Sequence, residues 1–202
     1  MLRETIRAPF AIGQSRTPRA QLGAFRRRVA KWSRMPYGCC MHSLTITEAR
    51  FPDDTDQVRA LIREYGDTLG VDLGFQDFER ELADLPGQYA APLGRVLLAW
   101  RDGEPVGCAA MRPHAGTACE MKRLYLRPAA RGLGCGRVMV KRLCAIARAQ
   151  GYTRLRLDTL PTMVEARALY RSLGFVPIPP YIFNPVPGTE YLELDLTAAP
   201  VE

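Results

Sequence analysis

The chain has 202 residues, 47% of them hydrophobic and 24% charged, which suits one globular domain with or without a tail. Its apolar runs are far shorter than the roughly 20 residues that span a bilayer, so we expect no transmembrane helix and no membrane partner. The net charge of +7 is concentrated in residues 1–41, which are +8, while the rest of the chain is −1. Because the rest of the chain is nearly neutral, it lacks the excess of basic residues that nucleic-acid binding requires, and we expect no nucleic-acid partner.

Residues 1–41 form a basic N-terminal tail, and three interpretations of it stay open. The tail is Arg-rich and acid-poor, as a mitochondrial transit peptide is, but it also fits a disordered arm or an upstream extension with Met41 as the functional start. We expect the domain itself to cover residues 42–202. A cytoplasmic location is expected, or the mitochondrial matrix if the tail is a transit peptide.

Six cysteines and two histidines show no metal-ligand spacing. The chain contains no C-x₂-C pair, so we expect no metal site. Scattered cysteines of this kind are typical of buried thiols in a reducing compartment.

In the first half of the chain, hydrophobic residues recur in some segments with the period of a strand and in others with the period of a helix. Asp102-Gly103 is a strong hairpin signal between two of the strands, because glycine tolerates positive φ. The predicted elements are a strand at 43–50, a helix from Pro52 to Gly70, a second helix with Phe75, Phe78, Leu82 and Leu85, and strands at 95–101, 105–112 and 118–126.

The second half reads as glycine loop, helix, strand, helix and strand. The helix at 136–150 turns Val138, Met139, Leu143, Ile146 and Ala147 inward. The strand at 153–159 turns Leu155 and Leu157 inward and Arg154, Arg156 and Asp158 outward. Thr162-x-x-Glu165 is a capping-box pattern for a helix that Gly174 ends, and the last strand is 191–196. The fold class is therefore α/β (α+β) with a mixed sheet, in the order β-α-α-β-β-β-α-β-α-β.

The segment Arg131-Gly132-Leu133-Gly134-Cys135-Gly136 lies between a strand and a helix. The first turn of a helix has unpaired N–H donors and a partial positive charge, and glycines let a phosphate approach them closely. Arg131 and Arg137 add countercharge. This pattern suits a pyrophosphate, although glycines that only allow a tight turn would give the same sequence pattern.

Two other phosphate loops fit less well. An ATP-type loop ends in Gly-Lys-Ser/Thr, whereas Gly136 is followed by Arg137-Val138. The dinucleotide fingerprint needs a third glycine where Arg137 stands, although Asp158 lies about where a ribose-binding acid belongs.

Three motifs together resemble the GNAT N-acetyltransferase superfamily. They are the loop Arg131-x-x-Gly134-x-Gly136, the preceding strand Met121–Pro128, and Leu169-Tyr170-Arg171-Ser172-Leu173-Gly174-Phe175, and the resemblance covers about residues 43–196. It implies a GNAT-like fold whose central parallel strands splay apart to hold the pantetheine arm of acetyl-CoA.

The resemblance also implies site residues. The backbone of Leu124, Tyr125 and Leu126 would pair with the pantetheine arm, and Arg131, Gly132, Leu133, Gly134, Cys135, Gly136 and Arg137 would hold the pyrophosphate. Tyr170 would protonate the leaving thiolate, because a phenol with a pKa near 10 is un-ionised at pH 7. An ordinary core tyrosine is the alternative.

Glu120, just before the point where the strands diverge, is the candidate base that takes the proton of the acceptor amine. The alternative is that Glu120 is an ordinary glutamate exposed to solvent on its strand. A covalent route through Cys119 lacks a paired histidine. On the acceptor side the candidates are Phe75, Gln76, Tyr181 and Asn184, the last two in a proline-rich loop at 177–188 that a rigid surface turn would explain equally.

The leading hypothesis is direct acetyl transfer from acetyl-CoA to a small-molecule amine. A coenzyme A-binding sensor without turnover and a Rossmann-like oxidoreductase are the alternatives. The sequence leaves open a homodimer and identifies neither the acceptor nor the acyl chain.

Overall fold

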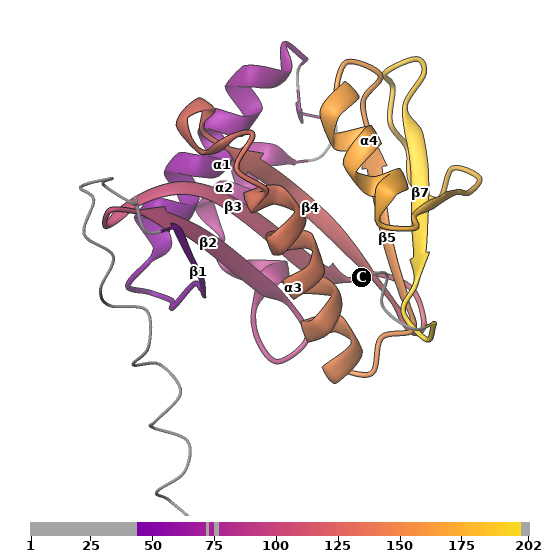
Figure 1. The fold of residues 1–202 in the computed structure, drawn as a ribbon, viewed down its shortest axis with the longest axis horizontal. Coiled ribbons are helices and arrows are strands. Elements are labelled where there is room, and N and C mark those ends of the chain that lie inside the picture. The colour runs from indigo at the N-terminus through magenta and orange to yellow at the C-terminus, as the bar shows by residue number, and fades with distance from the viewer. Residues whose placement is uncertain (1–43, 72, 75–76, 199–202) are drawn as a thin grey trace, which may run out of the picture. The chain divides into compact units, whose positions relative to one another are not determined.

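The computed structural model describes residues 44–71, 73–74 and 77–198, all of which lie in the compact unit Met41–Glu202. These residues form a mixed sheet with helices on both faces (Figure 1). The residues 1–43, with the predicted tail, lie outside the described ranges. None of the described helices is both long and apolar enough to cross a membrane.

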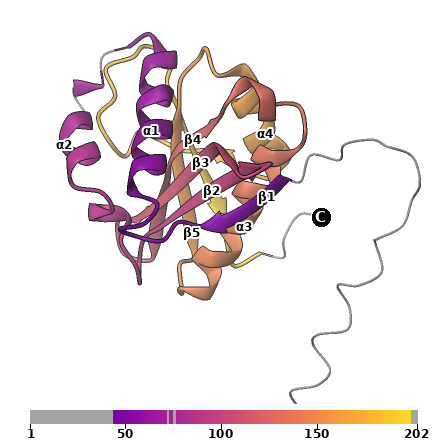
Figure 2. The ribbon, with the colours of Figure 1, turned by 90° about the vertical axis from the view of Figure 1, so that its left-hand side faces the viewer.

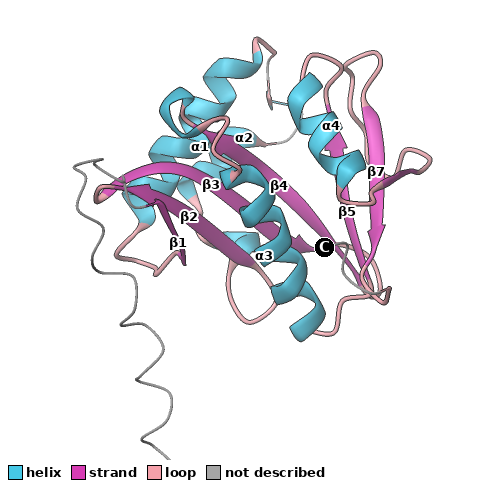
Figure 3. Ribbon diagram, in the orientation of Figure 1, coloured by secondary structure: helices cyan, strands magenta, loops and turns pink. Residues whose placement is uncertain are grey.

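The predicted helices and strands of the first half are present with small shifts of their ends (Figure 3). Asp102 and Gly103 have φ values of 54° and 85°, the left-handed pair that a tight two-residue hairpin requires. The elements are β1 (Leu44–Glu48), α1 (Thr55–Leu69), α2 (Phe78–Ala83), η2 (Gly87–Tyr89), β2 (Arg95–Arg101), β3 (Glu104–Pro113) and β4 (Ala118–Leu126).

The second half contains the predicted glycine loop, two helices and strands, and one short strand that was not predicted. Its elements are η3 (Pro128–Ala130), α3 (Cys135–Ala149), β5 (Arg154–Thr159), α4 (Val164–Ser172), β6 (Val176–Pro177) and β7 (Glu190–Asp195). β6 is two residues long, too short to give an alternating sequence pattern.

Two details of the predicted helices are wrong. Val138 is 53% exposed, because the buried stripe of α3 runs through Met139, Val140, Leu143 and Ala147. The capping box does not form: α4 begins at Val164 with Met163 as its N-cap, and no side chain caps it. The first error concerns which face of the helix is buried. The second concerns where the helix begins, which is defined only to within one or two residues.

The sheet has the order β1-β2-β3-β4-β5-β7-β6. All its neighbours are antiparallel except β4 and β5, which are parallel, as predicted. That parallel pairing covers only Ala118–Glu120 against Arg154–Arg156. Beyond it the two strands diverge (Figure 1).

A bulge in β4 accompanies the divergence. The register against β3 shifts between Cys108 and Ala110, and Arg123 has a φ of 59°. A bulge adds a residue to one strand and bends it, so it redirects β4 away from β5.

Two cores hold the layers together. α3 and α4 cover one face of the sheet, and α1 and α2 cover the other (Figure 2). On the α3 face, Met139, Leu143 and Leu157 are buried; on the α1 face, Leu61, Ile62 and Leu98 are buried. Because helices cover both faces of the sheet, side chains on either face are largely shielded from solvent.

Candidate active site

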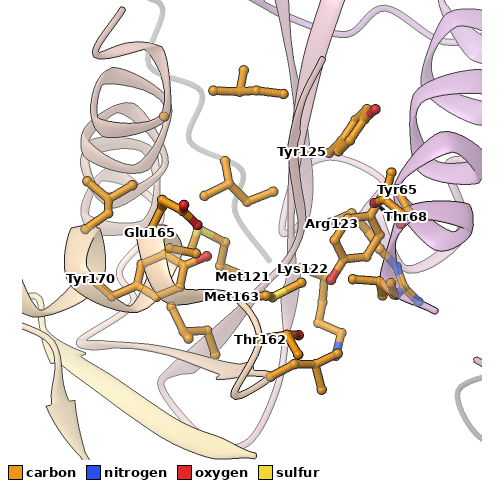
Figure 4. Close-up of a pocket in the computed structure, with 18 of the residues that line it drawn as sticks. Tyr65, Thr68, Met121, Lys122, Arg123, Tyr125, Thr162, Met163, Glu165 and Tyr170 are labelled. Carbon is orange, nitrogen blue, oxygen red and sulfur yellow. Dashed lines mark hydrogen bonds between the residues drawn. The ribbon is translucent and has the colours of Figure 1, made fainter. Parts of the chain in front are cut away.

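A cavity of about 860 Å³ occupies the gap between β4 and β5. Residues from both faces of the sheet line it: in Figure 4, Tyr170 and Glu165 approach from α4, while Tyr65 and Thr68 approach from α1. Met121, Lys122 and Arg123 of β4 lie between them. The divergence of the two strands therefore opens a cavity that helices from both faces of the sheet line.

The glycine loop forms one end of this cavity. Gly132 and Gly134 have φ values of 74° and 75°, and Gly134 is the N-cap of α3. Gly132, Gly134, Cys135, Gly136 and Arg137 line the cavity. The first-turn N–H groups of α3 have no partner within the helix, so this end of the cavity offers donors and a positive helix end to an anion.

The arginines and the other loop side chains differ in accessibility. Arg131 Nε donates to the Leu126 carbonyl oxygen at 2.9 Å, and Arg137 Nη2 donates to Ser172 Oγ at 2.8 Å. Both line the cavity. Leu133 is 58% exposed and is not among the lining residues, and burial of the Cys135 thiol raises its pKa. Any role of Leu133 and Cys135 in binding would therefore use their backbone.

The open edge of β4 forms the long wall of the cavity. Leu124, Tyr125 and Leu126 all line it. The Arg127 N–H donates to Val106 of β3, and hydrogen-bonding groups alternate sides along a strand. The N–H and C=O groups of Leu124 and Leu126 therefore face the gap, where β5 no longer pairs with them.

Tyr170 lines the cavity from α4, on the opposite side from α1. Its side chain packs against Phe175 with ring centroids 5.6 Å apart, and its hydroxyl forms no hydrogen bond with another described residue. Burial raises the pKa of the Tyr170 phenol above its usual value, and the charge of Asp158 adds to the effect. The phenol is therefore held protonated, and none of the described residues accepts a hydrogen bond from it.

Glu120 lies behind the cavity wall and does not line it. Its side chain is fully buried. Oε2 accepts from Arg112, whose Nη2 is 2.6 Å away, and Oε1 accepts from the Tyr181 hydroxyl at 3.0 Å. The interpretation as a solvated strand glutamate is therefore wrong, and the role of base stays a prediction for a carboxylate that is already held by two donors.

Lys122 and Asp158, which were not among the site residues proposed for an acetyltransferase, meet across the splay. Lys122 Nζ lies 2.9 Å from Asp158 Oδ1 and 3.8 Å from Glu120 Oε1. Asp158 Oδ2 accepts from Asn184 Nδ2 at 2.9 Å. Burial raises the pKa of Asp158, but the ammonium of Lys122 and the two hydrogen bonds outweigh it, so the net shift is downward.

The acceptor-side candidates have different outcomes. Asn184 lines the cavity, whereas Tyr181 does not and instead contacts Glu120. Phe75 and Gln76 lie outside the described residues. Arg123 lines the cavity and forms a buried two-point ion pair with Glu81, at 2.8 and 2.9 Å.

The sequence contained a signal for Lys122 and Asp158 that was misread. Asp158 was predicted to point outward. It does lie on the opposite face from Leu155 and Leu157, but its side chain is only 8% exposed. In a sheet with helices on both faces, the polar side of a strand faces the second layer and not solvent, so charges there must find partners.

Comparisons with known proteins agree with this architecture. Residues 57–175 match the family model described as "Acetyltransferase (GNAT) family". An uncharacterized N-acetyltransferase of Schizosaccharomyces pombe is 40% identical over 158 residues, covering 77% of this chain and 96% of the relative. An IAA acetyltransferase of Azospirillum brasilense is 37% identical over 155 residues, covering 75% and 98%.

Among solved structures, yncA of Salmonella typhimurium with its cofactor acetyl-CoA superposes with a TM-score of 0.57 at 22% identity, covering 78% of this chain and 98% of that one. The fold is therefore that of an acetyltransferase. The chain belongs to the acetyltransferase (GNAT) family, and the protein is an acetyltransferase enzyme. This assignment, with the largely antiparallel sheet, excludes the Rossmann-like oxidoreductase.

Proposed function

We propose that the protein transfers an acetyl group from acetyl-CoA directly to the amine of a small molecule. The observation that carries this proposal is that the glycine loop, the edge of β4 that no longer pairs with β5, and Tyr170 all line one cavity. A pyrophosphate at the start of α3 and a pantetheine arm along β4 would bring the thioester toward Tyr170. The acetyl-CoA that accompanies yncA supports the same cofactor here.

The acid role of Tyr170 is part of this proposal. The thiolate that leaves a thioester needs a proton, and the raised pKa keeps the phenol protonated at every pH of interest. Its hydroxyl forms no hydrogen bond with another described residue, so no such bond has to break before it donates.

A small acceptor is supported by the other half of the cavity. Tyr65, Val71 and Leu73 supply apolar wall, and Lys122 and Arg123 there are each paired with a carboxylate. A wall without excess charge suits a compact amine better than a strongly charged polymer.

Thiol release from acetyl-CoA tests the function, with tryptamine, spermidine, glycinamide and kanamycin as a first panel of amines. Turnover with at least one of them that depends on the enzyme is the expected result. Acetyl-CoA that raises the melting temperature, without turnover across a broad panel, would instead favour a non-catalytic sensor of the same fold. The absence of any stabilisation by acetyl-CoA would contradict both.

A further inference from the structure

The two candidate proton-handling groups of the cavity lie on opposite faces of the sheet. Tyr170 belongs to the core under α3 and α4, with Leu157 of β5 beside it in the same cluster. Asp158, the next residue of β5, points to the other face, because successive side chains of a strand alternate. Lys122 of β4 meets it there, 2.9 Å away.

We propose that Asp158 is the residue that contacts the acceptor nitrogen and takes its proton, with Lys122 and Asn184 as positioning residues. This inference rests on the proposed function and names a further catalytic residue for it. A thioester held in the splay would have Tyr170 on one face and Asp158 on the other. The nitrogen then approaches the carbonyl carbon from the α1 side, while the sulfur leaves beside α4.

The step balances without another reactant. The nitrogen lone pair forms the C–N bond and the C–S bond breaks, with its electron pair going to sulfur. The N–H becomes strongly acidic as the amide forms, so a carboxylate can accept its proton, and Asp158 then passes it to solvent. Tyr170 supplies the proton that the sulfur receives, and solvent restores it.

The contacts of Asp158 hold it in the ionised form that this role needs. Lys122 donates to Oδ1 and Asn184 donates to Oδ2, which fixes the plane of the carboxylate at the cavity wall. Glu120 is 3.8 Å from Lys122 and is itself paired with Arg112. The cluster therefore contains two carboxylates and two cations. The titratable groups that interact with Asp158 from the surrounding elements are the phenols of Tyr65, Tyr170, Tyr181 and Tyr191.

Glu120 is the rival for this role, and the geometry separates the two acids. Asp158 lines the cavity and Glu120 does not. Both acids accept hydrogen bonds on each oxygen, Glu120 from Arg112 and Tyr181 and Asp158 from Lys122 and Asn184, so access to the cavity is what separates them. Lys122, which does line the cavity, is 3.8 Å from Glu120 Oε1.

The experiment measures kcat, KM for the amine and acetyl-CoA affinity for the wild type, Asp158→Asn, Glu120→Gln and Asp195→Asn, using the best amine of the panel. Asp195 is the matched control, an exposed Asp on β7 that bonds Thr197 and Arg154 away from the cavity. Asp158→Asn should lower kcat about 100-fold or more with unchanged acetyl-CoA affinity, since a general base contributes ~10²–10⁴-fold. Asp195→Asn should match the wild type.

A pH profile of Lys122→Gln gives a second readout that a purely structural role would not move. Removing the ammonium raises the pKa of Asp158, so its ionised form is lost at a higher pH as the solution is acidified. The acid limb of kcat should therefore shift to higher pH than in the wild type. This arm also applies if Asp158→Asn fails to fold.

Each outcome has a distinct meaning. Wild-type turnover with an equally fast Asp158→Asn overturns the inference and leaves the proposed function intact. A loss confined to Glu120→Gln assigns the base to Glu120 and overturns the inference. An acid limb that does not shift in Lys122→Gln shows that no carboxylate beside Lys122 takes the proton, which overturns it too. A wild type that acetylates no amine overturns the proposed function, and this inference with it.

Discussion

The Tyr181 hydroxyl donates to Glu120 Oε1 across 3.0 Å, which joins the proline-rich loop to the central strand. Glu120 is fully buried, so each of its hydrogen bonds replaces one that water would have made. His114 and Tyr191 pack edge-on against the Tyr181 ring, with centroids 4.9 and 5.6 Å away. The loop is thus attached to the sheet by a side chain that was predicted to face a ligand.

Tyr181→Phe should destabilise the fold, because it removes a donor from a buried carboxylate. Hydrogen bonds to charged groups are worth about 1.5–3 kcal/mol, and urea unfolding measures the change. The matched control is Tyr191→Phe, since no hydrogen bond joins the Tyr191 hydroxyl to a described residue. Equal stability of the two variants would show that water replaces Tyr181 at no cost.

Tyr170→Phe should lower kcat and kcat/KM together while acetyl-CoA binds as before. The ring still packs against Phe175, and only the hydroxyl is lost. A general acid contributes about 10²–10⁴-fold, and a loss confined to the transition state appears in both constants. The loss should be smaller with a thioester that has a better leaving thiol. A variant as fast as the parent, where chemistry limits the rate, would remove Tyr170 from the mechanism.

Gly134→Asp should weaken acetyl-CoA binding while the fold is retained. A Cβ at Gly134 would meet no atom within 4 Å, so the substitution causes no clash, but its φ of 75° is strained for any other residue. A carboxylate about 4 Å from a phosphate costs roughly 1–4 kcal/mol between aqueous and surface dielectrics. Calorimetry measures the affinity.

Gly151→Asp is the matched control for that substitution. Gly151 follows the other end of α3 with a φ of 85°, and its Cβ would also meet nothing within 4 Å. It carries the same strain and charge away from the cavity. If both variants bind acetyl-CoA equally well, the pyrophosphate is held elsewhere.

Cys119→Ala should leave turnover within about twofold of the wild type. The Cys119 thiol is buried in the α3 core, donates weakly to the Arg154 carbonyl oxygen at 3.5 Å, and has its pKa raised to about 12 by burial. A thiol that stays protonated is a poor nucleophile. Loss of one sulfur atom from the core should cost about 1 kcal/mol or more in unfolding free energy. Trapping an acetyl-cysteine at Cys119 by mass spectrometry would support the covalent route instead.

Removing residues 1–41 should leave a folded protein that binds acetyl-CoA, because every predicted element begins after Met41. The comparison of melting temperatures with and without acetyl-CoA tests this in the full chain and in 42–202. A truncated chain that is unfolded, or that acetyl-CoA no longer stabilises, would make the tail integral to the domain.

Apart from the two-residue β6, the sequence by itself determined the order of helices and strands, because each rests on local chemistry. β2 and β4 have the predicted bounds, and Asp102-Gly103 and the loop from Gly132 to Gly136 are glycine-dependent turns that a short segment specifies. The family follows from the same motifs, since they occur in the order of a GNAT chain.

Only the tertiary structure decided which polar side chains reach the cavity. Glu120 and Asp158 are equivalent in sequence, each an acid that alternates with apolar residues on a strand. Asp158 lies beyond the paired segment of β4 and β5 and lines the cavity, whereas Glu120 lies within that segment and does not line it. Strand separation depends on the bulge at Arg123 and on layers that pack on both faces, and no local pattern encodes the distance between two strands.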